Sequence, residues 1–130
     1  MRPGLFHWGE QGMNIHARKV GNCAVLDLTK SALRQSAESV SDAVREALKD
    51  NPRKIILNMA VVEHVDSSFL ADLVTSFVNV QNQGSELVLV NLQTRVRHLL
   101  ELTRLIPVIE VFNDEESALA GIAGTAANGT

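Results

Sequence analysis

The sequence has little of what marks secreted and membrane proteins. It contains a single cysteine, Cys23, which cannot form an internal disulfide and suits a reducing compartment. No apolar run approaches the ~20 residues that a membrane-spanning helix needs. The first twelve residues also lack the continuous apolar stretch of a signal peptide. We therefore expect a cytoplasmic protein without membrane insertion.

The chain also lacks a large excess of positive or negative charge. Twelve lysines and arginines stand against fifteen aspartates and glutamates, so the formal net charge is -3. Proteins that bind nucleic acid through its phosphates usually present a strongly basic surface, and no basic stretch dominates this chain. We therefore expect no direct contact with nucleic acid.

Familiar cofactor and catalytic motifs are missing as well. The chain has no glycine-rich phosphate loop and no G-x-S-x-G elbow. Its four histidines are scattered, and no pair shows the spacing of metal ligands. We therefore predict no cofactor, no metal site and no catalytic residue, and so a protein that is not an enzyme.

What the sequence does contain is the composition of a folded domain. Of its 130 residues, 45% are hydrophobic and 21% charged, which fits one globular domain with a sizeable core. We place this domain at residues 13–120. Residues 1–12 are predicted to be an extension, and the Gly/Ala-rich residues 121–130 a flexible tail.

Strand and helix patterns follow each other regularly along this domain. NIHARKV and CAVLDLT flank Gly21-Asn22, which predicts a tight hairpin. SAESVSDAVREALK has helical spacing, with Ser36 as the predicted N-cap, and KIILNMAVV is a buried strand. The next predicted helix has an apolar stripe and ends near Gly84; the stripe consists of Leu70, Leu73, Val74, Phe77 and Val78. A strand, a helix, a strand and a helix follow: SELVLVN, TRVRHLLELT, PVIEVF and DEESALA.

This order predicts an α/β fold with a mixed sheet. An antiparallel hairpin is followed by parallel strand–helix–strand units, whose crossovers are right-handed, with about four helices packed against the sheet. Partners of such sheets meet the rim at the carboxyl ends of the strands. Three segments are predicted to leave that rim: Lys30–Gln35, Glu63–Ser68 and Asn91–Arg95.

Asp66-Ser67-Ser68 lies on this rim, between a buried strand and a helix, and three interpretations are open. One of these residues can cap the helix. Ser67 can be a nucleophile served by His64, although residues so near in sequence rarely face each other as a catalytic pair must. Alternatively, Ser67 is a substrate for phosphorylation, since a helix N-terminus tolerates a phosphate.

The stretch KIILNMAVVEHVDSSFLADLV, followed by GSELVLVNLQTRVRHLLELTRLIPVIEVFNDEESAL, resembles STAS domains. More narrowly, it is similar to the bacterial anti-sigma factor antagonists, and the resemblance covers about residues 14–120. It implies a phospho-switchable protein that sequesters an anti-sigma factor, often a GHKL-type serine kinase, and so regulates transcription. The resemblance makes Ser67 the phosphoacceptor, flanked by Asp66 and Ser68, and implies a phosphatase that resets it.

The chain departs from the family pattern at three places. Phe69 replaces the glycine after D-S-S, Thr29–Leu33 reads T-K-S-A-L where the family has T-G-E-L-D, and Arg104 replaces a helix-ending glycine. An alternative function is therefore a divergent, non-phosphorylated STAS subunit of a signalling or lipid-transport complex, with Phe69 as a hydrophobic anchor. The residues predicted to bind the partner are Asp66, Ser68, Phe69, Lys30, Ser31 and Arg95.

Overall fold

The computed structural model describes residues 15–29 and 39–121. Five strands form one sheet in the order β1-β2-β3-β4-β5, with β1 antiparallel to β2 and every later pair parallel. The strands are β1 Ile15–Val20, β2 Cys23–Leu28, β3 Lys54–Asn58, β4 Glu86–Val90 and β5 Glu110–Phe112. The helices are α2 Val40–Leu48, α3 Ser67–Asn82, α4 Thr94–Leu102 and a last helix over residues 115–121. The predicted mixed α/β fold is confirmed.

The hairpin has the predicted two-residue turn. Val20 pairs with Cys23 across it, and Gly21 has a positive φ of 61°, which favours glycine at the first turn position. At the far end of the sheet, the strand predicted from PVIEVF is shorter than expected. It begins at Glu110, after a cis peptide bond between Ile106 and Pro107.

The first described helix begins later than the sequence suggested. The N-cap of α2 is Ser39, whose hydroxyl accepts a hydrogen bond from the Asp42 N–H at 3.1 Å. The prediction of Ser36 as the cap is therefore wrong, and that residue lies outside the described part of the chain. A second acceptor comes from α3: the Asp72 carboxylate accepts from the N–H groups of Val40 and Ser41 at 2.7 and 3.2 Å. This bond ties the start of α2 to α3.

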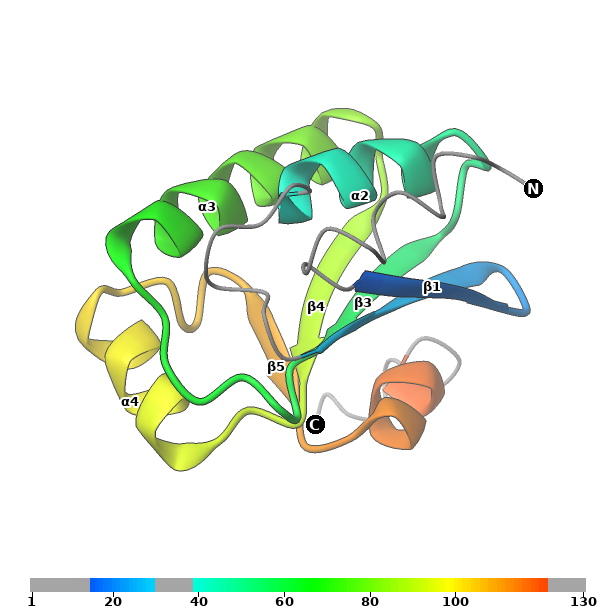
Figure 1. The fold of residues 1–130 in the computed structure, drawn as a ribbon. Helices are drawn as coiled ribbons and strands as arrows, with labels where there is room; N and C mark the ends of the chain where they lie inside the picture. Colours follow the sequence, from blue (N-terminus) through cyan, green and yellow to red (C-terminus); the bar gives the residue numbers. More distant parts are fainter. Residues whose placement is uncertain (1–14, 30–38, 122–130) are drawn as a thin grey trace.

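The two faces of the sheet carry different cores. We call the larger one the helix-side core; it lies beneath α2, α3 and α4, and its strand residues include Leu26, Leu57 and Leu89. The other, the second-face core, is smaller and lies beneath the helix 115–121. It consists of Val25, Ile56, Val88, Val90 and Ala118. Figure 1 shows α2 and α3 on one side of the sheet and the last helix, in orange, on the other.

The apolar stripe predicted for α3 is partly wrong. Val74 and Val78 are 40% and 47% exposed, whereas Leu73 is fully buried as expected. The buried face of α3 consists of Phe69, Leu73, Ser76 and Val80. These residues follow i, i+4, i+7 and i+11, the helical repeat that faces the sheet. α3 ends as predicted, because Gly84 follows the C-cap Gln83 with a positive φ of 81°.

The last helix begins with a cap and ends in a tight contact. The Asp114 carboxylate accepts from the Ser117 N–H at 2.8 Å. Gly121 is the last described residue and is helical, and the rest of the predicted tail, residues 122–130, lies outside the described residues. A Cβ on Gly121 would lie 2.8 Å from the Phe112 ring, which explains glycine at this position. Within the described ranges, no helix is long and apolar enough to cross a membrane.

Candidate functional site

The rim at the carboxyl ends of the strands is organised by the side chain of Asn58, the last residue of β3. Its amide donates to the Asp27 carboxylate on β2 at 2.7 Å. Its carbonyl oxygen accepts from the Asn91 side chain at 2.9 Å and from the Ala60 N–H at 3.1 Å. One side chain therefore ties together β2, the link after β3 and the link after β4.

Two of the three segments predicted to share this rim do meet. The Gln93 side chain, just before α4, donates to the Ala60 carbonyl at 2.7 Å. Arg95 Nη1 lies 3.5 Å from His64 Nδ1. The β3–α3 link is thus held against the start of α4, as the sequence predicted for residues 63–68 and 91–95. The third segment, with Lys30 and Ser31, lies outside the described residues.

Asp66-Ser67-Ser68 forms the start of α3. Asp66 is the N-cap, and its carboxylate accepts from the Phe69 N–H at 2.9 Å. Ser67 and Ser68 are the first two helical residues, both are exposed, and neither hydroxyl makes a hydrogen bond within residues 15–29 and 39–121. The capping interpretation is therefore confirmed for Asp66, and the two serines remain accessible from outside.

Phe69 does not lie on this surface. Only 4% of it is exposed, and its ring belongs to the helix-side core. The predicted role of Phe69 as a hydrophobic anchor for a partner stays a prediction, but its burial leaves little of the side chain to contact one. The physical reason is helical geometry: Phe69 starts the i, i+4, i+7 face that is turned toward the sheet. The ring also leaves the approach to Ser67 open, because it points into the core.

A groove separates the β3–α3 link from α4. Its volume is about 300 Å³, and it is lined by Glu63, His64, Val65, Arg95, Val96, His98, Leu99 and Leu102. Arg95, predicted as a partner contact, is exposed and stands on its wall. The groove ends two residues before Ser67 in sequence, so the serines and the groove belong to one rim.

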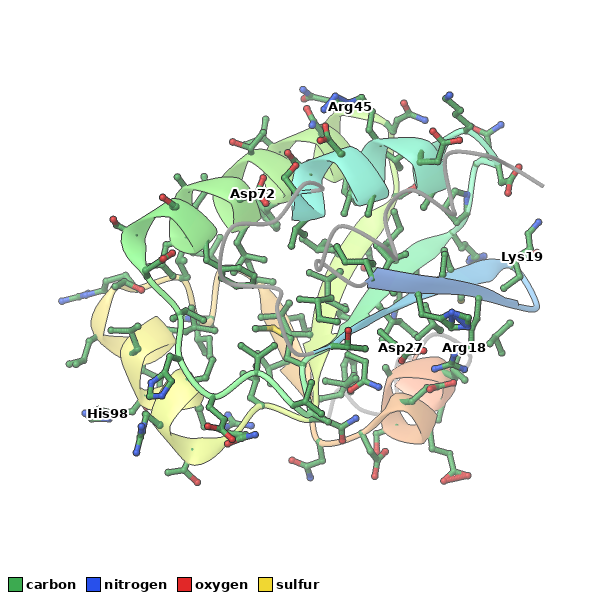
Figure 2. All side chains as sticks on the ribbon, in the orientation of Figure 1. Arg18, Lys19, Asp27, Arg45, Asp72 and His98 are labelled. Atoms are coloured by element: carbon green, nitrogen blue, oxygen red, sulfur yellow. The ribbon has the colours of Figure 1, made fainter. Side chains whose placement is uncertain are left out.

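On the second face, ionisable groups form a network. Arg18 donates two hydrogen bonds to Asp27, at 2.7 and 3.0 Å, and two to Glu115, at 2.8 and 3.3 Å. Figure 2 shows Arg18 and Asp27 turned toward each other beside the last helix. The Arg18 hydrogen bonds, with that of Asn58, lower the pKa of the Asp27 carboxyl below its ordinary value. The network thus holds Asp27 ionised and connects it to the rim.

The remaining groups that could act as a nucleophile, a base or a metal ligand do not form a cluster in the described part of the chain. Burial raises the pKa of the Cys23 thiol, which disfavours the reactive thiolate. Among the residues that the structure describes, no three His, Cys, Asp or Glu side chains are grouped to hold a metal ion. His64 Nδ1 lies 3.5 Å from Arg95 Nη1, and no hydrogen bond between His64 and Ser67 occurs among the described residues.

Sequence reasoning overlooked Asn58, Asn91 and Gln93, the polar residues that position the rim. A signal was present, because Asn58 and Asn91 each follow an uninterrupted apolar run. An amide at the end of a buried strand can bond neighbouring strands without carrying charge. Their partners could not be read from sequence, since they lie about thirty residues apart, at |i−j| of 31 and 33.

Solved structures with this fold are known. An anti-sigma factor antagonist from Mycobacterium paratuberculosis is 15% identical and has a TM-score of 0.75, over 87% of this chain and 96% of its own. An anti-sigma-factor antagonist (STAS) domain protein from Planctomyces limnophilus is 19% identical, with a TM-score of 0.69, over 84% and 97%. RsbS from Moorella thermoacetica, in a serine-to-glutamate variant, is 15% identical, with a TM-score of 0.66, over 88% and 98%.

At these identities, the solved structures establish the fold alone. The family is established by the sequence itself, which matches the profile of the STAS domain over residues 14–118. That span takes in all five strands, the rim and the start of the last helix. The chain therefore belongs to the STAS domain family.

Proposed function

We propose that this protein is an anti-sigma factor antagonist, a protein-binding module switched by phosphorylation of Ser67. The observation that carries the proposal is the position of Ser67, an exposed hydroxyl at the first residue of α3, directly after the Asp66 cap. Two structures with the same fold come from proteins described as anti-sigma factor antagonists, which supports the choice of partner.

The exposed side of α3 is suited to a protein partner. Its sixteen residues include one charged side chain, Asp72, and that carboxylate is occupied in capping α2. The exposed surface starting at Ser67 and Ser68 continues to Val74 and Val78 and is therefore uncharged. Protein interfaces are depleted of charge at their centres, so we propose that the anti-sigma factor covers this surface.

Phosphate on Ser67 would act at the edge of this uncharged surface. It adds about -1.5 to -2 charges at pH 7. The first N–H groups of α3 and the helix dipole favour an anion there, so the fold tolerates the modification. A partner that fits a neutral surface would have to desolvate that charge, which opposes binding. Dephosphorylation by a phosphatase would restore the complex.

The test is phosphorylation by a candidate anti-sigma kinase and ATP, with the site mapped by mass spectrometry. We expect phosphate on Ser67, none in Ser67→Ala, and a loss of kinase binding in Ser67→Asp. Ser68→Ala is the matched control, because Ser68 is also exposed and lies one residue away; it should keep both phosphorylation and binding. Absence of phosphate on Ser67 together with unchanged binding of Ser67→Asp would refute the switch.

A second candidate keeps the α3 surface and removes the switch. In this case the protein is a constitutive STAS subunit of a signalling or lipid-transport complex, docked through Val74 and Val78. These exposed valines support a docked partner in both candidates, and only the second places no role on Ser67. Val74→Asp should then break the complex, whereas Ser67→Ala and Ser67→Asp should leave it intact. Phe69→Gly is not a useful test, because it removes a buried ring and destabilises the fold.

A further inference from the structure

α4 differs from α3 in its charge. It contains Arg95, Arg97 and His98 against one acid, Glu101, and Arg104 follows two residues after its end. The whole chain carries a net charge of -3, so α4 is a basic element on an acidic protein. The positive charge of α4 therefore does not follow from the overall composition of the chain, and it needs a reason of its own.

The cations of α4 have no anionic partner in the described part of the chain. Arg18, Arg45 and Lys49 each lie within 4.0 Å of a carboxylate, whereas Arg95, Arg97 and Arg104 make no ion pair among residues 15–29 and 39–121. The hydrogen bond of the Arg95 guanidinium within those ranges is with His64, at 3.5 Å. These charges are available to an external anion.

Beside these cations lies the apolar part of the groove between the β3–α3 link and α4. Val96 is buried beneath it, Val65 and Leu99 are half-buried, and Leu102 at its edge is 66% exposed. Leu102 is among the most exposed large apolar side chains of the described structure. The groove thus offers an apolar strip with Arg95, His64 and His98 along it.

We propose that this groove receives an acidic amphipathic segment of a protein partner. Leucine-type side chains of the segment would pack on Leu99 and Leu102, and its carboxylates would pair with Arg95 and the neighbouring basic groups. A nucleic acid fits less well, because the chain as a whole carries a net charge of -3 and no Phe, Tyr or Trp ring lines the groove to stack on bases. The proposal does not require phosphorylation of Ser67.

The probe is a synthetic peptide repeating Glu-Leu-Leu-Glu, titrated into isotope-labelled full-length protein and followed by amide chemical shifts. We expect shifts concentrated in residues 63–65 and 95–102, and weaker binding as salt is added. Arg95→Glu should raise Kd at least roughly tenfold, because it places like charges opposite each other. Leu102→Ser should also weaken binding, which separates the apolar contribution from the ionic one.

The matched control is Arg45→Glu, the same reversal on α2. Arg45 is exposed and far from the groove, as the labels of Arg45 and His98 in Figure 2 show. Its Kd should be unchanged, and thermal melting should show all variants folded. The proposal is overturned if the peptide does not bind, if the shifts lie elsewhere, or if a Lys-Leu-Leu-Lys peptide binds equally well. Stronger shifts with an RNA oligonucleotide would overturn the choice of partner.

Discussion

The two faces of the sheet are covered by different physical means. On the helix side, three helices bury an apolar layer that includes Leu26, Leu57 and Leu89. On the second face, the helix 115–121 buries one small side chain completely, Ala118. Leu119 of the same helix is half-buried against this core. Two further attachments are polar: Glu115 pairs with Arg18, and the Ala118 carbonyl lies 3.5 Å from Nζ of Lys54.

The two faces contribute differently to the stability of this small domain. Apolar burial is proportional to area and insensitive to direction, so the helix-side core supplies most of the stability. Hydrogen bonds and ion pairs add less net stability but demand a fixed geometry. The second-face contacts therefore fix where the last helix lies, more than they stabilise the whole domain.

The largest expected effect compares two neighbours on β3 that point to opposite faces. Leu57 and Ile56 are both fully buried, in the helix-side and second-face cores respectively. Leu57→Ala should lower the free energy of unfolding by about 3–5 kcal/mol, because three packed helices cannot close the cavity. Ile56→Ala should cost about 2–3 kcal/mol, because one short helix can move inward. Urea unfolding measures both, and equal losses would contradict the comparison.

The next effect tests the polar attachment of the second face. Arg18→Met removes the hydrogen bonds to Asp27 and Glu115 and should lower the free energy of unfolding by about 1–2 kcal/mol. Lys19→Met is the control, because the Lys19–Asp50 pair at 3.4 Å is exposed and should contribute less than about 0.5 kcal/mol. Amide hydrogen exchange should show faster opening of residues 115–121 in Arg18→Met only.

A smaller effect concerns pH. The pKa of Asp27 is lowered in the folded state, so its contribution to stability is complete above its unfolded pKa of about 4. That contribution is lost as pH falls through the folded pKa. Since Arg18 is the main cause, the stability difference between wild type and Arg18→Met should shrink as the pH falls below the unfolded pKa of about 4. Denaturant titrations across this range would show it, and a constant difference would argue against the ion pair.

The smallest effect lies on neither face and acts through the backbone. Arg104 follows α4 with a positive φ of 67°, where the family pattern has glycine. Arg104→Gly should raise the free energy of unfolding by up to about 1 kcal/mol, because glycine relieves the left-handed strain. Arg97→Gly, inside the same helix, should lower it by about 1 kcal/mol. Thermal melting would measure both variants. If the melting temperatures of Arg104→Gly and Arg97→Gly changed in the same direction, left-handed strain at Arg104 would be excluded as the explanation.

Much of the fold was predictable from local pattern. The Gly21-Asn22 turn, the strand type of the apolar runs and the glycine after α3 were placed correctly, because each depends on neighbouring residues alone. The cap of α2 was misplaced, since Ser36 and Ser39 both precede a helical pattern. The stripe of α3 was displaced because spacing alone does not tell which flank of a helix faces the sheet.

By itself, the sequence determined the type and order of the elements, the accessible Asp66-Ser67-Ser68 at a strand–helix junction, and a close resemblance to STAS domains. Only the tertiary structure decided that Phe69 is buried, that Asn58 joins three segments, and that Arg95 meets His64 across a groove. The reason is physical. Periodicity and capping are local properties of the chain, whereas burial and side-chain partners depend on segments about thirty residues apart that only the folded sheet brings together.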